Sequence, residues 1–135
     1  MITEPLRYMS ETERSRVQRY IEIVTCRLER DLVEVWLFGS FARGDMWGKS
    51  WPMNSDIDLL ILTTQLLHEE DREHLINETY PLYLECGRQL SHQFRTVAEF
   101  ENPTTERGAT FKERIAEEGR RIFSRDSLLP KHNKQ

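Results

Sequence analysis

The apolar residues in the first thirty positions recur at helical spacing, and they define one side of an amphipathic helix. They are Val17, Ile21, Val24 and Leu28. The tetrapeptide SETE at residues 10–13 has the form of a capping box, which is typical of the start of a helix. We therefore expect a helix over residues 10–30 whose apolar side lies on a sheet.

Two short apolar runs follow, and their length and composition are typical of strands. Residues 32–38 are rich in Val, Trp and Phe and end at a glycine. Residues 57–62 are almost continuously apolar, which predicts a strand covered on both faces. The polar segment between the two runs contains Gly44, Gly48 and Pro52 and predicts a loop.

The second half of the chain predicts a long helix and then a weaker strand. Residues 68–86 have a helical pattern, in which Pro81 is expected to kink or divide the helix and Gly87 to end it. The apolar residues of this helix that are available for packing are Leu75, Ile76, Tyr80, Tyr83 and Leu84. Residues 91–97 form the weaker strand candidate.

A turn with the sequence NPTT, residues 102–105, precedes a last predicted helix over about residues 106–118. The apolar residues expected to face inward here are Phe111, Ile115 and Ile122. We expect one domain, residues 1–123, followed by a flexible tail, residues 124–135. The order helix, strand, strand, helix, strand, helix predicts a small α/β or α+β fold.

Composition and charge narrow the classes of protein. The chain has 135 residues, 38% hydrophobic and 31% charged, which is typical of a globular domain, and no run of about 20 apolar residues predicts a membrane span. A cytoplasmic protein is expected, because the first residues do not resemble a secretory signal. The net charge of −4 argues against tight binding of long nucleic acids. Cys26 and Cys86 are too far apart in the sequence to suggest a disulfide framework or a zinc site.

Asp56 and Asp58 stand at the start of the second predicted strand, with one residue between them. Side chains two residues apart on a strand point to the same face, so the two carboxylates are expected to lie side by side. Such a pair of oxygen ligands suits Mg²⁺, with water and substrate phosphates at its other positions. The alternative is that each aspartate caps a loop or pairs with an arginine, and the pair alone does not decide between the two.

Gly39-Ser40 directly follows the first predicted strand, and Arg43 comes about one turn later. A glycine lets the backbone approach a ligand, a serine can cap the next helical turn, and the free N–H groups of that turn suit a phosphate. Arg43 is expected to contact a phosphate or to hold one of the aspartates. Alone, this segment also fits a capped turn with a surface arginine. Together with the aspartates it indicates a phosphate site and a metal site at one sheet edge.

The sequences LFGSFARG and SDIDLLIL resemble the nucleotidyltransferase signature of the DNA polymerase β superfamily. The chain length resembles the minimal nucleotidyltransferases, which are MntA-type antitoxins paired with HEPN-domain ribonuclease toxins. The resemblance extends over roughly residues 10–123 and implies a single small domain with helices packed on a mixed sheet. It also implies that Gly39, Ser40 and Arg43 bind the nucleotide and that Asp56 and Asp58 bind the metal.

The sequence departs from this signature in two respects. The usual form has about ten residues between the serine and the first aspartate, whereas this chain has five more. The excess contains Trp47, Lys49 and Trp51, which are expected either to contact a base or partner or to anchor the loop to its own domain. The next strand also has no third carboxylate, a group that in the superfamily often serves as metal ligand or general base.

Three residues are candidates for the missing third group. Glu99 is the nearest carboxylate in the sequence and Glu85 a poorer choice. His92 lies on the strand itself, but a single histidine there is more often structural. Loss of a general base costs about 10²- to 10⁴-fold in rate and does not abolish a metal-assisted reaction.

The resemblance implies a Mg²⁺-dependent transfer of AMP from ATP to a hydroxyl, with release of pyrophosphate. Larger relatives carry a further domain that holds their acceptor, so the acceptor here is expected on another molecule. A tyrosine of a cognate HEPN ribonuclease toxin is the leading candidate, and its modification would switch the ribonuclease off. Two alternatives remain open: a catalytically weak antitoxin that acts by binding alone, and a small-molecule adenylyltransferase that works as an oligomer.

Overall fold

A computed structural model describes residues 4–45, 56–86 and 88–125. Its elements, in chain order, are η1 (Glu4–Leu6), α1 (Glu11–Leu28), η2 (Glu29–Asp31), β1 (Leu32–Phe38), α2 (Ser40–Arg43), β2 (Ile57–Thr63), α3 (Glu69–Cys86), β3 (Leu90–Thr96), α4 (Val97–Glu101), α5 (Glu106–Glu118) and β4 (Arg120–Ser124). The segment with Trp47, Lys49 and Trp51 and the last ten residues of the expected tail lie outside the described residues.

The four strands form one mixed sheet in the order β3-β2-β1-β4. Strand β1 runs antiparallel to both β2 and β4, whereas β2 and β3 are parallel. The parallel pair requires a crossover connection, which α3 provides. The expected fold class, a mixed sheet packed with helices, is confirmed.

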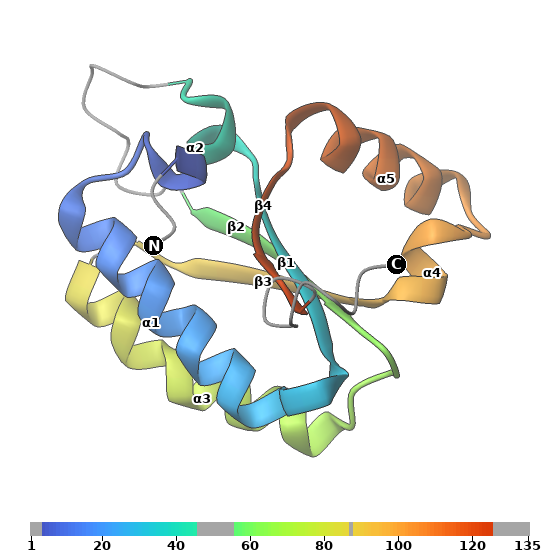
Figure 1. The fold of residues 1–135 in the computed structure, drawn as a ribbon, viewed down its shortest axis with the longest axis horizontal. Coiled ribbons are helices and arrows are strands. Elements are labelled where there is room, and N and C mark those ends of the chain that lie inside the picture. The colour runs from blue at the N-terminus through green and yellow to red at the C-terminus, as the bar shows by residue number, and fades with distance from the viewer. Residues whose placement is uncertain (1–3, 46–55, 87, 126–135) are drawn as a thin grey trace, which may run out of the picture.

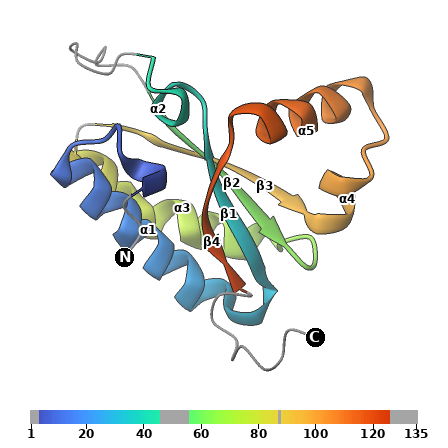
Figure 2. The ribbon, with the colours of Figure 1, turned by 45° about the horizontal axis from the view of Figure 1, so that its top comes forward.

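Helices cover both faces of the sheet (Figures 1 and 2). On one face, α1 and α3 pack against each other and against the large core, in which Tyr20, Phe41 and Leu75 are fully buried. On the other face, α4 and α5 cover a smaller cluster built on Phe38 and Ile115. The coverage on both faces explains why β2 is an almost continuous apolar run.

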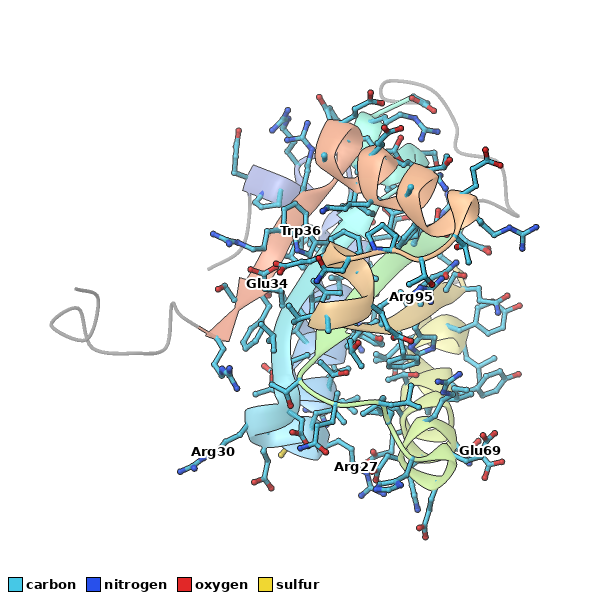
Figure 3. The ribbon with its side chains drawn as sticks, turned by 90° about the vertical axis from the view of Figure 1, so that its right-hand side faces the viewer. Arg27, Arg30, Glu34, Trp36, Glu69 and Arg95 are labelled. Carbon is cyan, nitrogen blue, oxygen red and sulfur yellow. The ribbon has the colours of Figure 1, made fainter. Side chains whose placement is uncertain are left out.

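The second face also uses polar and aromatic side chains, as Figure 3 shows beneath α4 and α5. Trp36 lies on β1, and its indole N–H donates to Glu34 at 2.8 Å. On β3, the Arg95 guanidinium lies over the ring of Phe111, 5.3 Å from its centroid. These contacts satisfy the polar groups at the margin of the smaller cluster.

Most predicted elements form where the patterns placed them. The capping box at the start of α1 is present, since Ser10 accepts from the Glu13 N–H and Glu13 accepts from the Ser10 N–H. The predicted strand over residues 32–38 and the predicted helix over residues 106–118 have the expected bounds. Helix α3 is not divided, because it runs through Pro81.

The packing face of α3 was predicted correctly for Leu75 and wrongly for most of the other apolar residues named. Leu75 and Leu82 are buried, but Ile76, Tyr80 and Leu84 are 46%, 55% and 64% exposed. Helical spacing alone cannot tell which of two neighbouring apolar stripes faces a sheet. Here the side with Leu75 and Leu82 faces the core, and the side with Ile76, Tyr80 and Leu84 lies on the surface.

The sequence pattern also missed β4. Ile122, which was expected to follow the last helix as an inward-facing residue, is buried in this strand. The strand is short and carries Arg120 and Arg121, so it has a weak strand pattern, and it gains its stability as an edge strand paired with β1. In the part of the chain that the structure describes, no helix is long and apolar enough to cross a membrane.

Candidate functional site

The register between β1 and β2 brings the two halves of the sequence signature together. Phe38, the last residue of β1, pairs with Asp58, so Gly39 comes next to the Asp58 side chain. A Cβ atom built on Gly39 would lie 2.2 Å from Asp58 Oδ2, and the residue has a φ of +80°. Both the contact and the backbone conformation therefore require glycine at this position.

The two aspartates are partly buried where β2 begins. Burial, followed by the negative charge of Asp56, raises the pKa of Asp58 to about 6, and the guanidinium groups of Arg114 and Arg43 offset part of this effect. A carboxylate whose charged form is disfavoured in this way gains from a nearby cation. The described residues contain no group of three or more metal-binding side chains. Two carboxylates fit Mg²⁺ when water and phosphate supply the remaining ligands.

The turn after β1 differs from the expected one in its cap. Gly39 is the residue before α2, and its carbonyl accepts from the N–H groups of Ala42 at 3.0 Å and Arg43 at 3.1 Å. Ser40 is the first residue of the helix, so the expectation that it caps the turn is wrong.

Glu118, the last residue of α5, lies against this turn and was not expected there. Its carboxylate accepts from the Gly39 N–H at 2.7 Å, from Arg43 at 2.8 Å and from Arg114 at 3.1 Å. Burial alone would raise the pKa of Glu118, but the Gly39 hydrogen bond and the two arginines together lower it. The backbone N–H expected to receive a phosphate is therefore bonded to a carboxylate.

Arg43 holds carboxylates other than the signature pair. Besides Glu118 it binds Asp45, with its Nη2 atom 2.7 Å from Oδ2, and these bonds raise the pKa of Arg43 and lower that of Asp45. The side chain is 39% exposed and lines a surface pocket together with Glu118 and Arg120. Arg43 thus lies at the site, where it binds Asp45 and Glu118 instead of Asp56 or Asp58.

The structure places the candidates for a third carboxylate away from the aspartates. Glu99 closes a capping box with Thr96 at the far end of β3, and Glu85 binds Arg16 of α1. The residue paired with Asp58 on β3 is Ser91. The proposals for Glu99 and Glu85 therefore have no support from position.

His92 is also not directed at the aspartates. Its Nδ1 lies 2.7 Å from the Tyr20 hydroxyl, on the face of the sheet that α1 covers, and burial lowers its pKa to about 4. It is a neutral, structural histidine at ordinary pH.

The site contains two residues that sequence reasoning did not select, Glu118 and Arg114. Arg114 stacks over the ring of Phe38 at 5.1 Å and is close enough to lower the pKa of Asp58. The only local signal is their spacing of four residues on one helix, which is common on exposed helices. Their position at the site depends on where the end of α5 meets β1.

Comparison with known families identifies the class of protein. A model described as polymerase beta nucleotidyltransferase matches residues 22–128. The match covers most of the chain, so this protein belongs to that nucleotidyltransferase family. The expectation drawn from LFGSFARG and SDIDLLIL is confirmed. A comparison with curated proteins gives no match.

Several solved structures share the fold. The spectinomycin adenyltransferase of Enterococcus faecialis, solved with ATP and spectinomycin, matches with a TM-score of 0.62 and 16% identity over 87% of this chain and 59% of that enzyme. The toxin–antitoxin pair MntA–HepT contains a chain that matches with a TM-score of 0.52 and 14% identity, over 85% of this chain and 75% of that chain.

A third match comes from the complex of a tri-AMPylated Shewanella oneidensis HEPN toxin with its MNT antitoxin. The TM-score is 0.51 and the identity 13%, over 86% of this chain and 76% of that chain. At these identities the likeness extends to the fold and not to the substrate.

Proposed function

We propose that this protein transfers AMP from ATP to a hydroxyl group and releases pyrophosphate. The observation that supports the proposal is the contact between Gly39 and Asp58, because the turn after β1 and the pair of carboxylates lie side by side. Asp56 and Asp58 hold Mg²⁺, and Gly39, Ser40 and Arg43 hold the phosphates. When bound, Mg²⁺ lowers the pKa of the acceptor hydroxyl and neutralises charge on the reacting phosphate.

The residues of the turn act mainly by positioning. The acceptor oxygen forms a bond to the α-phosphorus while the bond from that phosphorus to the β-bridging oxygen breaks, and the hydroxyl proton leaves to water. Pyrophosphate departs with two electrons from the broken bond. Holding its phosphates in line at Gly39 and Ser40 supplies much of the rate, as in other phosphoryl-transfer reactions.

Glu118 has to leave the Gly39 N–H before a phosphate takes its place. In the structure its carboxylate accepts hydrogen bonds from this N–H and from Nη1 at one edge of the Arg43 guanidinium, which are two donors suited to phosphate. Displacement of Glu118 by the triphosphate frees Arg43 and Arg114 to bind the nucleotide. Before ATP binds, the hydrogen bonds of Glu118 to Gly39 and Arg43 hold the turn in its conformation.

We further propose that the acceptor is a tyrosine of a HEPN ribonuclease toxin. The support is the shared fold with the antitoxins of the MntA–HepT pair and of the Shewanella oneidensis complex, in which the HEPN toxin is tri-AMPylated. Attached AMP adds negative charge and bulk where an RNA phosphate has to bind, so the ribonuclease would be inactivated by repulsion and occlusion.

The intact mass of a HEPN ribonuclease, sought in the reading frames next to the gene of this chain, tests the proposal. After incubation with ATP and Mg²⁺ its mass should rise by whole AMP units, and the inactivation should persist after the two proteins are separated. The Asp56→Asn/Asp58→Asn double variant should fold, with unchanged or slightly higher stability because charge repulsion is relieved, and should lose transfer by at least about 100-fold. Unchanged transfer by that variant would contradict the metal site.

Inhibition by binding alone is the second candidate function. It is favoured by one observation, that Ser91 and not a carboxylate stands beside Asp58 on β3. In that case the mass of the ribonuclease stays constant and its activity returns on separation. Transfer of AMP to a small molecule instead would indicate an oligomeric small-molecule enzyme.

A further inference from the structure

An exposed apolar stripe runs along the outer side of α3. Ile76, Tyr80, Tyr83 and Leu84 are 46%, 55%, 37% and 64% exposed. Their spacing of four, three and one residues puts them on one side of the helix, and the rings of Tyr80 and Tyr83 lie 5.7 Å apart. A contiguous group of this kind on a helix is typical of an interaction surface.

None of the four residues of the stripe belongs to either hydrophobic cluster of the described residues. The opposite side of α3 holds the helix to α1, through the pairs Glu85–Arg16 and Asp71–Arg27. Leu75 and Leu82 supply its contacts with the core. Substitutions on the stripe should therefore leave the fold intact.

A pocket of about 150 Å³ lies between the stripe and the edge strand β3. Tyr80 and Tyr83 form one wall, and Leu90 and His92 form the other. Since β3 is the outermost strand of the sheet, the pocket opens at an edge. It has room for one apolar side chain of a partner, which would lie between aromatic rings with polar groups at the margin of the pocket.

The charge beside the stripe indicates the kind of partner. Helix α3 carries six carboxylates and one arginine, and Glu69 and Glu73 continue the stripe towards the start of the helix. Glu69 and Glu73 are exposed and form no ion pair with any described residue. A second copy of this chain would bring the same negative charges together, whereas a basic surface would pair with them.

The stripe also has a favourable position relative to the site. Leu90 in the pocket follows the end of α3 and pairs with Ile57, and the next pair is Ser91 with Asp58. Leu90 and Ile57 belong to the core under α1 and α3, whereas Asp58, one residue further along β2, points to the opposite face of the sheet. The pocket and Asp58 therefore lie on adjacent strands but on opposite faces, and β3 is the edge between them. Figure 1 shows the C-terminal, yellow end of α3 on the same side of the molecule as α2.

We propose that this stripe, with Glu69 and Glu73 at its acidic end, is the docking surface for the acceptor protein. The partner presents a basic surface with an apolar side chain that enters the pocket, as expected of a ribonuclease surface that neutralises RNA phosphates with lysine and arginine. The identity of the partner rests on the proposed function. Docking there brings an acceptor hydroxyl around the β3 edge to Asp58.

Binding of the full chain to the same HEPN ribonuclease, measured by titration calorimetry without ATP, tests the surface. Tyr80→Ser/Leu84→Ser and Glu69→Lys/Glu73→Lys should each weaken binding by about 10-fold or more. The glutamate variant should also lose most of the salt dependence of association. Leu66→Ser, at a position 70% exposed, is the apolar control. Glu106→Lys/Glu113→Lys on α5 is the charge control.

The outcomes separate the docking surface from the proposed function. Stripe variants that bind as tightly as the wild type, or a wild type that does not bind, would overturn the docking surface. The same holds if the chain alone sediments as a dimer that the Tyr80/Leu84 variant dissociates, since the stripe is then an interface between copies. If the stripe variants lose binding but the wild type adds no AMP to the ribonuclease, the docking surface stands and the transfer reaction fails.

Discussion

The sequence context of Ser40 suits both a helix cap and a phosphate contact, and the structure separates these two roles. Because Gly39 and not Ser40 precedes α2, Ser40→Ala removes no cap and should change the free energy of unfolding by less than about 0.5 kcal/mol. It should lower AMP transfer by about 10-fold or more, since a phosphate contact is lost. Thr105→Ala is the matched control: Thr105 accepts the Gly108 N–H at 3.0 Å, and its loss should cost about 0.5–2 kcal/mol. A destabilised Ser40 variant with full turnover would contradict the assignment.

Substitution of Gly39 can separate the cost of backbone strain from the cost of the contact with Asp58. Gly39→Ala should lower the free energy of unfolding by at least about 1–3 kcal/mol, because alanine is strained at this φ and its Cβ meets Asp58. In an Asp58→Gly background the contact is absent and only the backbone strain remains, so the cost should be smaller. Chemical denaturation of the four proteins of this cycle measures the difference. Equal costs in both backgrounds would show that Asp58 does not press on Gly39.

At the scale of elements, the end of α5 controls access to the phosphate-binding turn. Glu118→Gln keeps an oxygen for the Gly39 N–H but weakens the pairs with Arg43 and Arg114, so we expect lower thermal stability. If Glu118 competes with the triphosphate, the KM for ATP should fall in this variant. A higher KM would instead mean that Glu118 holds the turn in its binding conformation. Glu117→Gln, at the exposed neighbouring position, controls for the change in net charge.

The elements also show which information is local. The capping box at Ser10 and the mainly apolar run of β1 depend on neighbouring residues, and the capping box and the bounds of β1 were predicted correctly. The two halves of the signature, LFGSFARG and SDIDLLIL, likewise depend on residues that are neighbours in the sequence. Strand β4 and Glu118 depend on contacts across about 80 residues, and the sequence pattern carries no signal for them. A single sequence therefore predicts the strands and turns of this site better than the helix end that closes it.

At the scale of the whole molecule, two partly buried groups, His92 and Asp58, give the free energy of unfolding opposite pH dependences. The pKa of His92 is lowered to about 4, so between pH 6.5 and 4 the unfolded chain binds a proton that the folded protein does not. This lowers the free energy of unfolding by up to about 1.4 kcal/mol for each pH unit of acidification. The pKa of Asp58 is raised to about 6, so over much of the same range the folded protein binds the extra proton and acidification is stabilising.

Variants at the two positions should reveal these opposing effects. In Asp58→Asn only the histidine contribution remains, and the midpoint of urea unfolding should fall more steeply between pH 6.5 and 4.5 than in the wild type. In His92→Gln the fall should be absent or reversed. The Tyr20 hydroxyl lies 2.7 Å from His92 Nδ1, and burial raises its pKa, so this phenol stays neutral over the range. Parallel profiles for all three proteins would contradict the pKa directions.

The antiparallel ladder between β1 and β2 determines the distance between Gly39 and Asp58, because Phe38 and Asp58 are paired residues. The number of residues in the connection between Asp45 and Asp56 has no part in that alignment. Lengthening such a connection costs only about 0.6 kcal/mol of closure entropy for each doubling. Evolution can therefore change the size of this segment, and with it whatever the segment contacts, while the chemistry stays in place. A sequence pattern for distant homologues should accordingly keep the two halves fixed and leave the gap between them open.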